Sequence, residues 1–175
     1  MDKYKENFEK GTEHYIKLLE EIKWFDNPYV EKDKVIENIT KCTFPPNYST
    51  YLRQIGYLTD YAGIFQLTGV LDETLKFIPD SRYEITDNTL TVFVKDEDYI
   101  FDFDVNEFEA GEGIEGFAEA YLNQILEKEG IEYRFYELPP DDETVSLIFV
   151  KPEVYKQAIK YGIIPDFLGY FAVNY

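Results

Sequence analysis

Three segments between residues 82 and 105 constrain the fold of this chain most strongly, because each alternates apolar and polar residues with a period of two. They are RYEIT at 82–86, TLTVFVK at 89–95 and YIFDFDV at 99–105. Such alternation is typical of strands with one buried and one solvated face. The connections of two and three residues leave room only for tight turns. The segments therefore predict an antiparallel β-meander.

The third segment separates its residue types between its two faces. One face holds Tyr99, Phe101, Phe103 and Val105, and the other holds Ile100, Asp102 and Asp104. We expect the aromatic face to be buried and the aspartate face to be wet.

Residues 114–129 have the clearest helical pattern, because apolar residues recur there at intervals of three and four. The inward residues are Ile114, Phe117, Ala118, Tyr121, Leu122, Ile125 and Leu126, and Gly130 is expected to end the helix. Similar patterns predict helices at 3–25, 33–42, 50–68 (ended by Gly69) and 152–161 (between Pro152 and Gly162). Strands are expected at 131–138 and 143–150, and the segment 73–78 is read as a weak strand.

The order of these elements predicts an α+β fold: N-terminal helices, a β-meander, a helix, a β-hairpin and a C-terminal helix, with helices packed on a mostly antiparallel sheet. A length of 175 residues suits one domain. We expect a single domain over 1–175, with a helical part at 1–69 and a sheet-containing part at 70–175.

The charge is unevenly distributed along the chain. There are 35 Asp and Glu residues against 17 Lys and Arg residues, a net charge of −18, and residues 96–127 hold eleven of the acids and no base. These residues coincide with a predicted strand, a loop and a predicted helix, so a rigid frame would hold the carboxylates. The expected partner-binding residues are Asp96, Glu97, Asp98, Asp102, Asp104, Glu107, Glu109, Glu112, Glu115 and Glu119.

The composition excludes several classes of function. Nucleic acids and anionic membranes are not expected as direct partners, because phosphate binding needs clusters of Lys and Arg that the chain lacks. The single Cys42 and the single His14 rule out a zinc site of the Cys2His2 type. With no disulfide to form and no apolar leader in MDKYKENFEKG, the expected location is the cytoplasm.

No motif for catalysis or for a cofactor is present. The pair Asp102 and Asp104 does not extend into a calcium-binding loop pattern, and neither a nucleophile elbow nor a phosphate-binding glycine loop occurs. We therefore expect no catalytic residue, no metal site and no cofactor.

The leading hypothesis is a cytosolic inhibitor or immunity-type protein that docks its carboxylate-rich face on a basic partner, such as a nuclease or another nucleic-acid-binding protein. One alternative is an enzyme that binds a small molecule or a divalent metal in an acidic cleft between the meander and the helix at 114–129. A second alternative is a homo-oligomeric structural protein that dimerises through the apolar segment 163–175.

Overall fold

The computed structural model describes residues 3–41, 55, 65–86, 88–102, 116–141 and 144–165. The helical elements are α1 (Lys3–Glu9), α2 (Thr12–Glu21), the 3-10 turn η1 (Trp24–Asp26), α3 (Lys32–Lys41), α5 (Phe65–Thr74), the 3-10 turn η2 (Leu75–Phe77), the π-helical turn η3 (Ala118–Leu122), α7 (Asn123–Lys128) and α8 (Pro152–Tyr161). The strands are β1 (Ser81–Thr86), β2 (Thr89–Val94), β3 (Glu97–Asp102), β4 (Arg134–Asp141) and β5 (Thr144–Val150).

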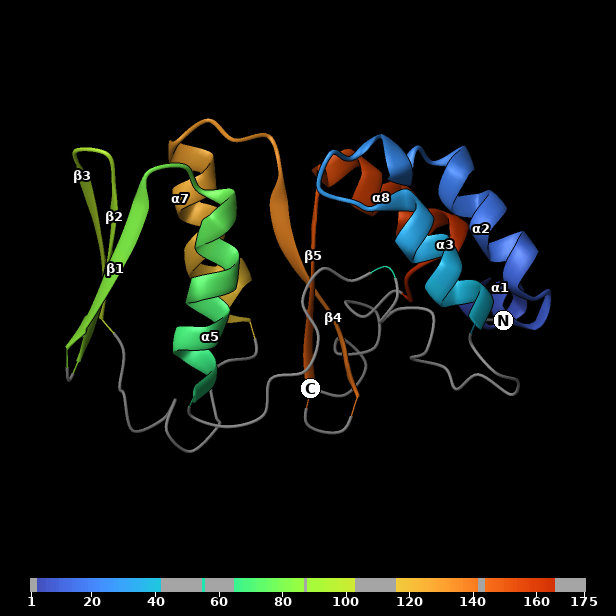
Figure 1. Cartoon of the computed structure of the whole chain (residues 1–175), viewed down its shortest axis with the longest axis horizontal. Coiled ribbons are helices and arrows are strands. Elements are labelled where there is room, and N and C mark those ends of the chain that lie inside the picture. Colours follow the sequence, from blue (N-terminus) through green and yellow to red (C-terminus); the bar gives the residue numbers. More distant parts are fainter. Residues whose placement is uncertain are drawn as a thin grey trace.

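The described elements form layers along the long axis of the molecule (Figure 1). The meander lies at one end, followed by α5 and α7, then the β4–β5 hairpin, and finally α1, α2, α3 and α8 at the other end. The α+β prediction is confirmed, but the strands form two antiparallel sheets, β1-β2-β3 and β4-β5, rather than one.

The β4–β5 hairpin is buried on both faces and takes part in two hydrophobic cores. Phe135, Leu147 and Phe149 point into the core shared with the meander, α5 and α7. Leu138 and Ile148 point into the core shared with the N-terminal helices and α8. Burial on both faces explains why β5 contains the unbroken apolar run LIFV instead of an alternating pattern.

The predicted meander is confirmed, with a shift at its second turn. The turn between β2 and β3 is Lys95-Asp96, not 96–98, and Lys95 adopts a φ of 54°. A two-residue turn with a positive φ matches the twist of the flanking strands. β3 therefore begins at Glu97, with Tyr99 buried and Ile100 and Asp102 exposed as predicted.

Two predictions about the helices and one about a strand were wrong. The single helix expected at 3–25 is divided at Gly11, whose φ of 89° and ψ of 179° suit glycine and do not continue a helix. Most of the helix predicted at 50–68 lies outside the described residues, but Gly69 does not end a helix, and 73–78 is not a strand. Instead α5 continues through Gly69 and into η2, because Val70, Leu71 and Leu75 keep helical spacing and are all buried.

The helix predicted at 114–129 is confirmed over its described part. Its first described turns are π-helical, and α7 follows. Phe117, Leu122 and Ile125 are buried as the spacing indicated. Gly130 ends the helix with a φ of 70°, while the Ile131 N–H donates to the Leu126 carbonyl at 2.9 Å.

The C-terminal end of α8 is capped by side chains from α1 and α2. The donors reach four consecutive carbonyls: Lys3 Nζ to Lys160 (3.0 Å), Asn7 Nδ2 to Tyr161 (2.7 Å) and Gly162 (3.1 Å), and the Tyr15 hydroxyl to Ile163 (2.8 Å). These carbonyls have no partner within the helix, so the contacts join the two ends of the chain's described part.

Candidate docking surface

The meander presents one buried and one exposed face. On the inner face, Leu90 and Val92 are fully buried against the core that contains α7. The opposite face, which we call the outer face, points away from that core. Its residues are Arg82, Glu84 and Thr86 on β1, Thr89, Thr91 and Phe93 on β2, and Asp98, Ile100 and Asp102 on β3.

The strand register determines which outer-face residues are neighbours. Ile100 lies beside Thr91, Asp98 lies beside Phe93, and Asp102 lies beside Thr89. Along β3, Asp98 and Asp102 each stand about 6.7 Å from Ile100, the repeat of two residues on a strand. Both carboxylates are exposed, and the Ile100 side chain is 66% exposed. A large aliphatic side chain thus stands in water between two carboxylates.

The basic residues near this face are held by other groups. The Arg82 guanidinium lies 3.7 Å from the centre of the Phe93 ring, and its Nη1 is 3.0 Å from Glu84 Oε1. Within the described part of the chain, neither Asp98 nor Asp102 forms an ion pair with a base. The β3 side of the outer face therefore keeps its negative charge.

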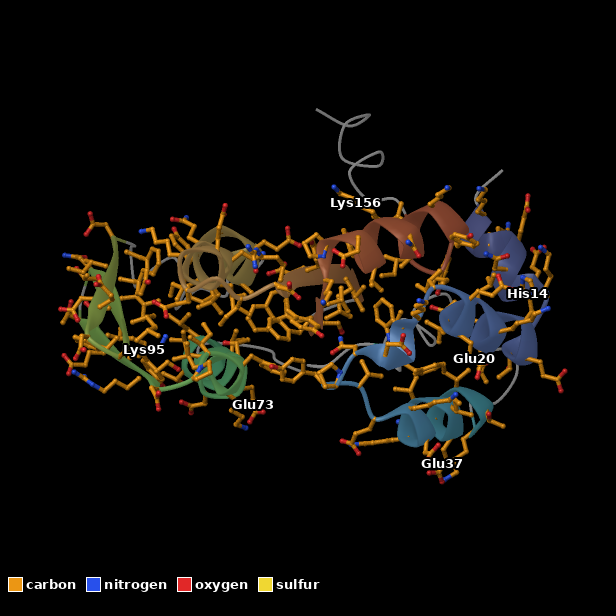
Figure 2. All side chains as sticks on the ribbon, turned by 90° about the horizontal axis from the view of Figure 1, so that it is seen from above. His14, Glu20, Glu37, Glu73, Lys95 and Lys156 are labelled. Atoms are coloured by element: carbon orange, nitrogen blue, oxygen red, sulfur yellow. The ribbon has the colours of Figure 1, made fainter. Side chains whose placement is uncertain are left out.

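Lys95 is directed toward the helical side of the meander. Its Nζ lies 2.8 Å from Glu129 Oε2, and the Tyr99 hydroxyl donates to Glu129 Oε1 at 2.7 Å. These hydrogen bonds hold the pKa of Glu129 below its ordinary value, and the bond to Glu129 raises the pKa of Tyr99 to about 12. Figure 2 shows Lys95 at the meander end, opposite His14 and Glu20 at the helical end.

The structure places two of the ten expected binding residues, Asp98 and Asp102, on the outer face, whereas Asp96 lies in the turn before β3 and Glu97 is on the same side of the strand as Tyr99. Asp96, Glu97, Asp98 and Asp102 are all exposed on β3 and the turn before it. Glu119 is placed elsewhere. Five residues lie outside the described part of the chain: Asp104, Glu107, Glu109, Glu112 and Glu115.

Glu119 is exposed but is directed toward the hairpin. Its Oε1 accepts a hydrogen bond from the Glu137 N–H of β4 at 2.7 Å. Because the η3–α7 helix lies between the meander and the hairpin, Glu119 is on the side away from the outer face (Figure 1). Glu137 in turn accepts a hydrogen bond from the Gly116 N–H at 2.6 Å, so the start of this helix is joined to β4.

Sequence reasoning did not include Ile100, Phe93 or Glu84 in the binding site. The period of β3 placed Ile100 on the wet face, which was the available signal for this residue. Which residues of β1 and β2 lie on the outer face depends on strand register. A count of acids along the sequence gives no information about that register.

The two ends of the molecule differ strongly in charge. The helical part, residues 3–41 and 151–165, carries ten acids and eleven bases, a net charge of +1. The meander part, residues 65–86, 88–102 and 116–141, carries fourteen acids and five bases, a net charge of −9. A charged partner would be oriented by this asymmetry before contact.

The space between the meander and the helix after Gly116 is filled by side chains. Phe101 and Tyr121 meet edge to face with ring centres 5.0 Å apart, and Leu122 is fully buried beside them. A separate hollow of about 410 Å³ lies between η1 and the start of α8, where Lys23, Lys151 and Glu153 line it. It is of mixed charge and far from the outer face.

Three further findings bear on function. The described residues include no group of three or more His, Cys, Asp or Glu side chains that could hold a metal ion. In the same part of the chain, none of the helices combines the length and apolarity needed to cross a bilayer. Comparisons with protein-family models, curated proteins and solved structures give no match.

Of the segment 163–175, Ile163 and Ile164 are buried in the core of the helical part. The residues from 166 onward lie outside the described part of the chain.

Proposed function

We propose that this protein is a non-catalytic interaction module of the inhibitor or immunity type, acting in the cytoplasm. It docks the outer face of the meander on a basic surface of another protein, such as a nuclease or another nucleic-acid-binding protein. The observation that carries the proposal is the exposed Ile100 between the carboxylates of Asp98 and Asp102 on an ordered strand.

This arrangement has the features of a protein-binding surface. Large apolar side chains surrounded by polar groups provide the anchors of many interfaces, and the surrounding groups exclude water from them. Carboxylates at the rim favour cationic partners and raise the rate of association. Since Asp98 and Asp102 are not neutralised by a described base, their charge is available to a partner.

A nucleic-acid-binding partner fits this chemistry because its substrate groove is already cationic. Carboxylates on the outer face would occupy positions that phosphates take in the substrate complex. The net charge of −9 on the meander part, against +1 on the helical part, would steer this end of the molecule into such a groove.

The test compares three baits in lysate of the native host. They are the wild type, the double variant Asp98→Lys/Asp102→Lys on the outer face, and the control Glu9→Lys/Glu13→Lys on α1 and α2. The two variants carry the same net charge, and Glu9 and Glu13 are exposed like the two aspartates. Any difference in capture between the two variants therefore reports where the substituted charges lie, not the total charge.

We expect the wild type and the control to capture the same basic protein, and the outer-face variant to lose it. The capture should fall as salt rises, because exposed charges are screened beyond about 8–10 Å. The captured protein should also bind nucleic acid less tightly when this chain is present. Equal capture by both variants, or equal loss, would show that the outer face is not the docking surface.

A further inference from the structure

β3 is an edge strand of the three-stranded sheet, because the strand order is β1-β2-β3. The two-residue turn makes Val94 and Glu97 the first pair of the β2–β3 hairpin. In such a hairpin the backbone of every second residue faces the neighbouring strand, and the backbone of the residues between them faces outward. Glu97, Tyr99 and Phe101 thus face β2.

Asp98, Ile100 and Asp102 consequently direct their backbone N–H and C=O groups to the open edge. Within the described residues, no other segment forms a backbone hydrogen bond with them. The same three residues also place their side chains on the outer face. One strand thus offers main-chain hydrogen bonds and an acidic–apolar–acidic row of side chains together.

The other edge of the sheet does not have this combination. On β1 the outer-face residues are Arg82, Glu84 and Thr86, and the arginine is paired with the glutamate at 3.0 Å. That edge has little net charge to select a partner. The β3 edge has two carboxylates and no base.

A second copy of this chain is a poor occupant of the β3 edge. If two β3 strands paired antiparallel around Ile100, Asp98 of one copy would face Asp102 of the other. Like charges directly opposite each other destabilise a strand pair, and acidic edge residues commonly prevent self-association in this way. The same geometry favours a strand with basic residues at the facing positions.

We propose that the basic partner contributes an extended segment that pairs antiparallel with β3 as a fourth strand. The segment carries Lys or Arg opposite Asp98 and Asp102 and an aliphatic residue opposite Ile100, a pattern of basic, any, aliphatic, any, basic. This inference rests on the proposed docking of a basic partner and specifies how it is achieved. Main-chain bonds would provide affinity and the alternate side chains specificity.

The test uses a synthetic seven-residue peptide, threonine–lysine–threonine–valine–threonine–lysine–threonine, with blocked ends. Its control is the same peptide with the valine amide nitrogen methylated. Methylation removes the hydrogen-bond donor that would face Ile100 and leaves the charge unchanged. Both affinities are measured by titration at low salt, and amide hydrogen exchange of the protein is followed in parallel.

We expect the methylated peptide to bind about tenfold more weakly or not at all, the effect of losing one to two hydrogen bonds. The unmodified peptide should slow exchange of the amides of Asp98, Ile100 and Asp102, whereas those of Tyr99 and Phe101 should stay as they are. The variant Asp98→Asn/Asp102→Asn should weaken binding several-fold, and the control Glu9→Gln/Glu13→Gln on α1 and α2, which removes the same charge, should change it less than about twofold.

Two outcomes would overturn the inference. Equal binding of both peptides would mean that charge alone attracts them. The proposed docking of a basic partner would then be retained, and the proposed strand pairing with β3 would be rejected. Absence of binding by either peptide would also reject strand pairing. In that case the lysate comparison of the two lysine variants decides the proposed function separately.

Discussion

Asn7 provides the most direct test of how the two ends of the described chain are held together. This side chain is only 7% exposed, and its Nδ2 donates to the carbonyls of Tyr161 (2.7 Å) and Gly162 (3.1 Å) at the end of α8. Its Oδ1 lies 3.1 Å from His14 Nε2. We consider the substitution Asn7→Ala, which removes all three contacts and does not disrupt α1.

The expected loss of unfolding free energy is about 2–4 kcal/mol. Each hydrogen bond contributes about 1 kcal/mol, and carbonyls left without a partner in a buried place add to the cost. With a urea slope of about 2 kcal/mol/M for a chain of this size, the unfolding midpoint should fall by about 1–2 M. Urea unfolding followed by circular dichroism measures this midpoint.

The matched control is His14→Ala, which removes one partner of Asn7 and leaves both carbonyl contacts. Since His14 is only half-buried, its loss should cost about 1 kcal/mol or less. If Asn7→Ala costs no more unfolding free energy than the control, the contacts of Asn7 with the end of α8 do not stabilise the fold.

Three further predictions follow from the structure. Gly162→Ala should destabilise the protein by about 2–4 kcal/mol, because Gly162 has a φ of 69° and the new Cβ would lie 2.5 Å from Lys3 Cβ. A thermal melt with an unchanged melting temperature would contradict this packing. Glu129→Gln should lower stability at pH 7, because the hydrogen bonds from Lys95 and Tyr99 hold the pKa of Glu129 below its ordinary value. The difference from the wild type should shrink progressively as the pH falls below about 4.3 and Glu129 becomes protonated, and urea titrations that give the same difference at about pH 7 and about pH 2 would reject this cause. Ile100→Ser should change stability by less than about 0.5 kcal/mol, since the side chain is exposed, yet weaken capture of the basic partner about tenfold; unaltered capture would remove Ile100 from the docking surface.

Residue periodicity predicted most of the fold, since it reflects which side chains are buried. The alternation in β2 and β3 and the spacing of Phe117, Leu122 and Ile125 gave the correct elements and faces. The error at 73–78 arose because this segment contains only the last apolar positions of a longer helical stretch. The short segment resembled a strand only when separated from Val70 and Leu71.

The division into two sheets could not be read from the chain, because it depends on what covers each face. β5 is apolar at every position from Leu147 to Val150, and a run of this kind fits any strand buried on both sides. In the fold, one face of β5 packs on the core that contains α7, and the other packs on the core of the N-terminal helices.

The candidate surface was predictable in its charge but not in its extent. Counting acids identified Asp98 and Asp102, whereas the direction of Glu119 depends on its hydrogen bond to β4. The role assigned to Ile100 came from its exposure between the two aspartates. Charge along a sequence does not specify which carboxylates share a face.

Binding of cationic chains to the outer face of the meander can be measured directly. Amide chemical shifts in a titration with poly-L-lysine of about 20 residues locate the binding residue by residue. We expect Thr91, Asp98, Ile100 and Asp102 to shift most and added salt to reverse these shifts. Large shifts on α1, α2 or α8 with an unchanged outer face would contradict this expectation.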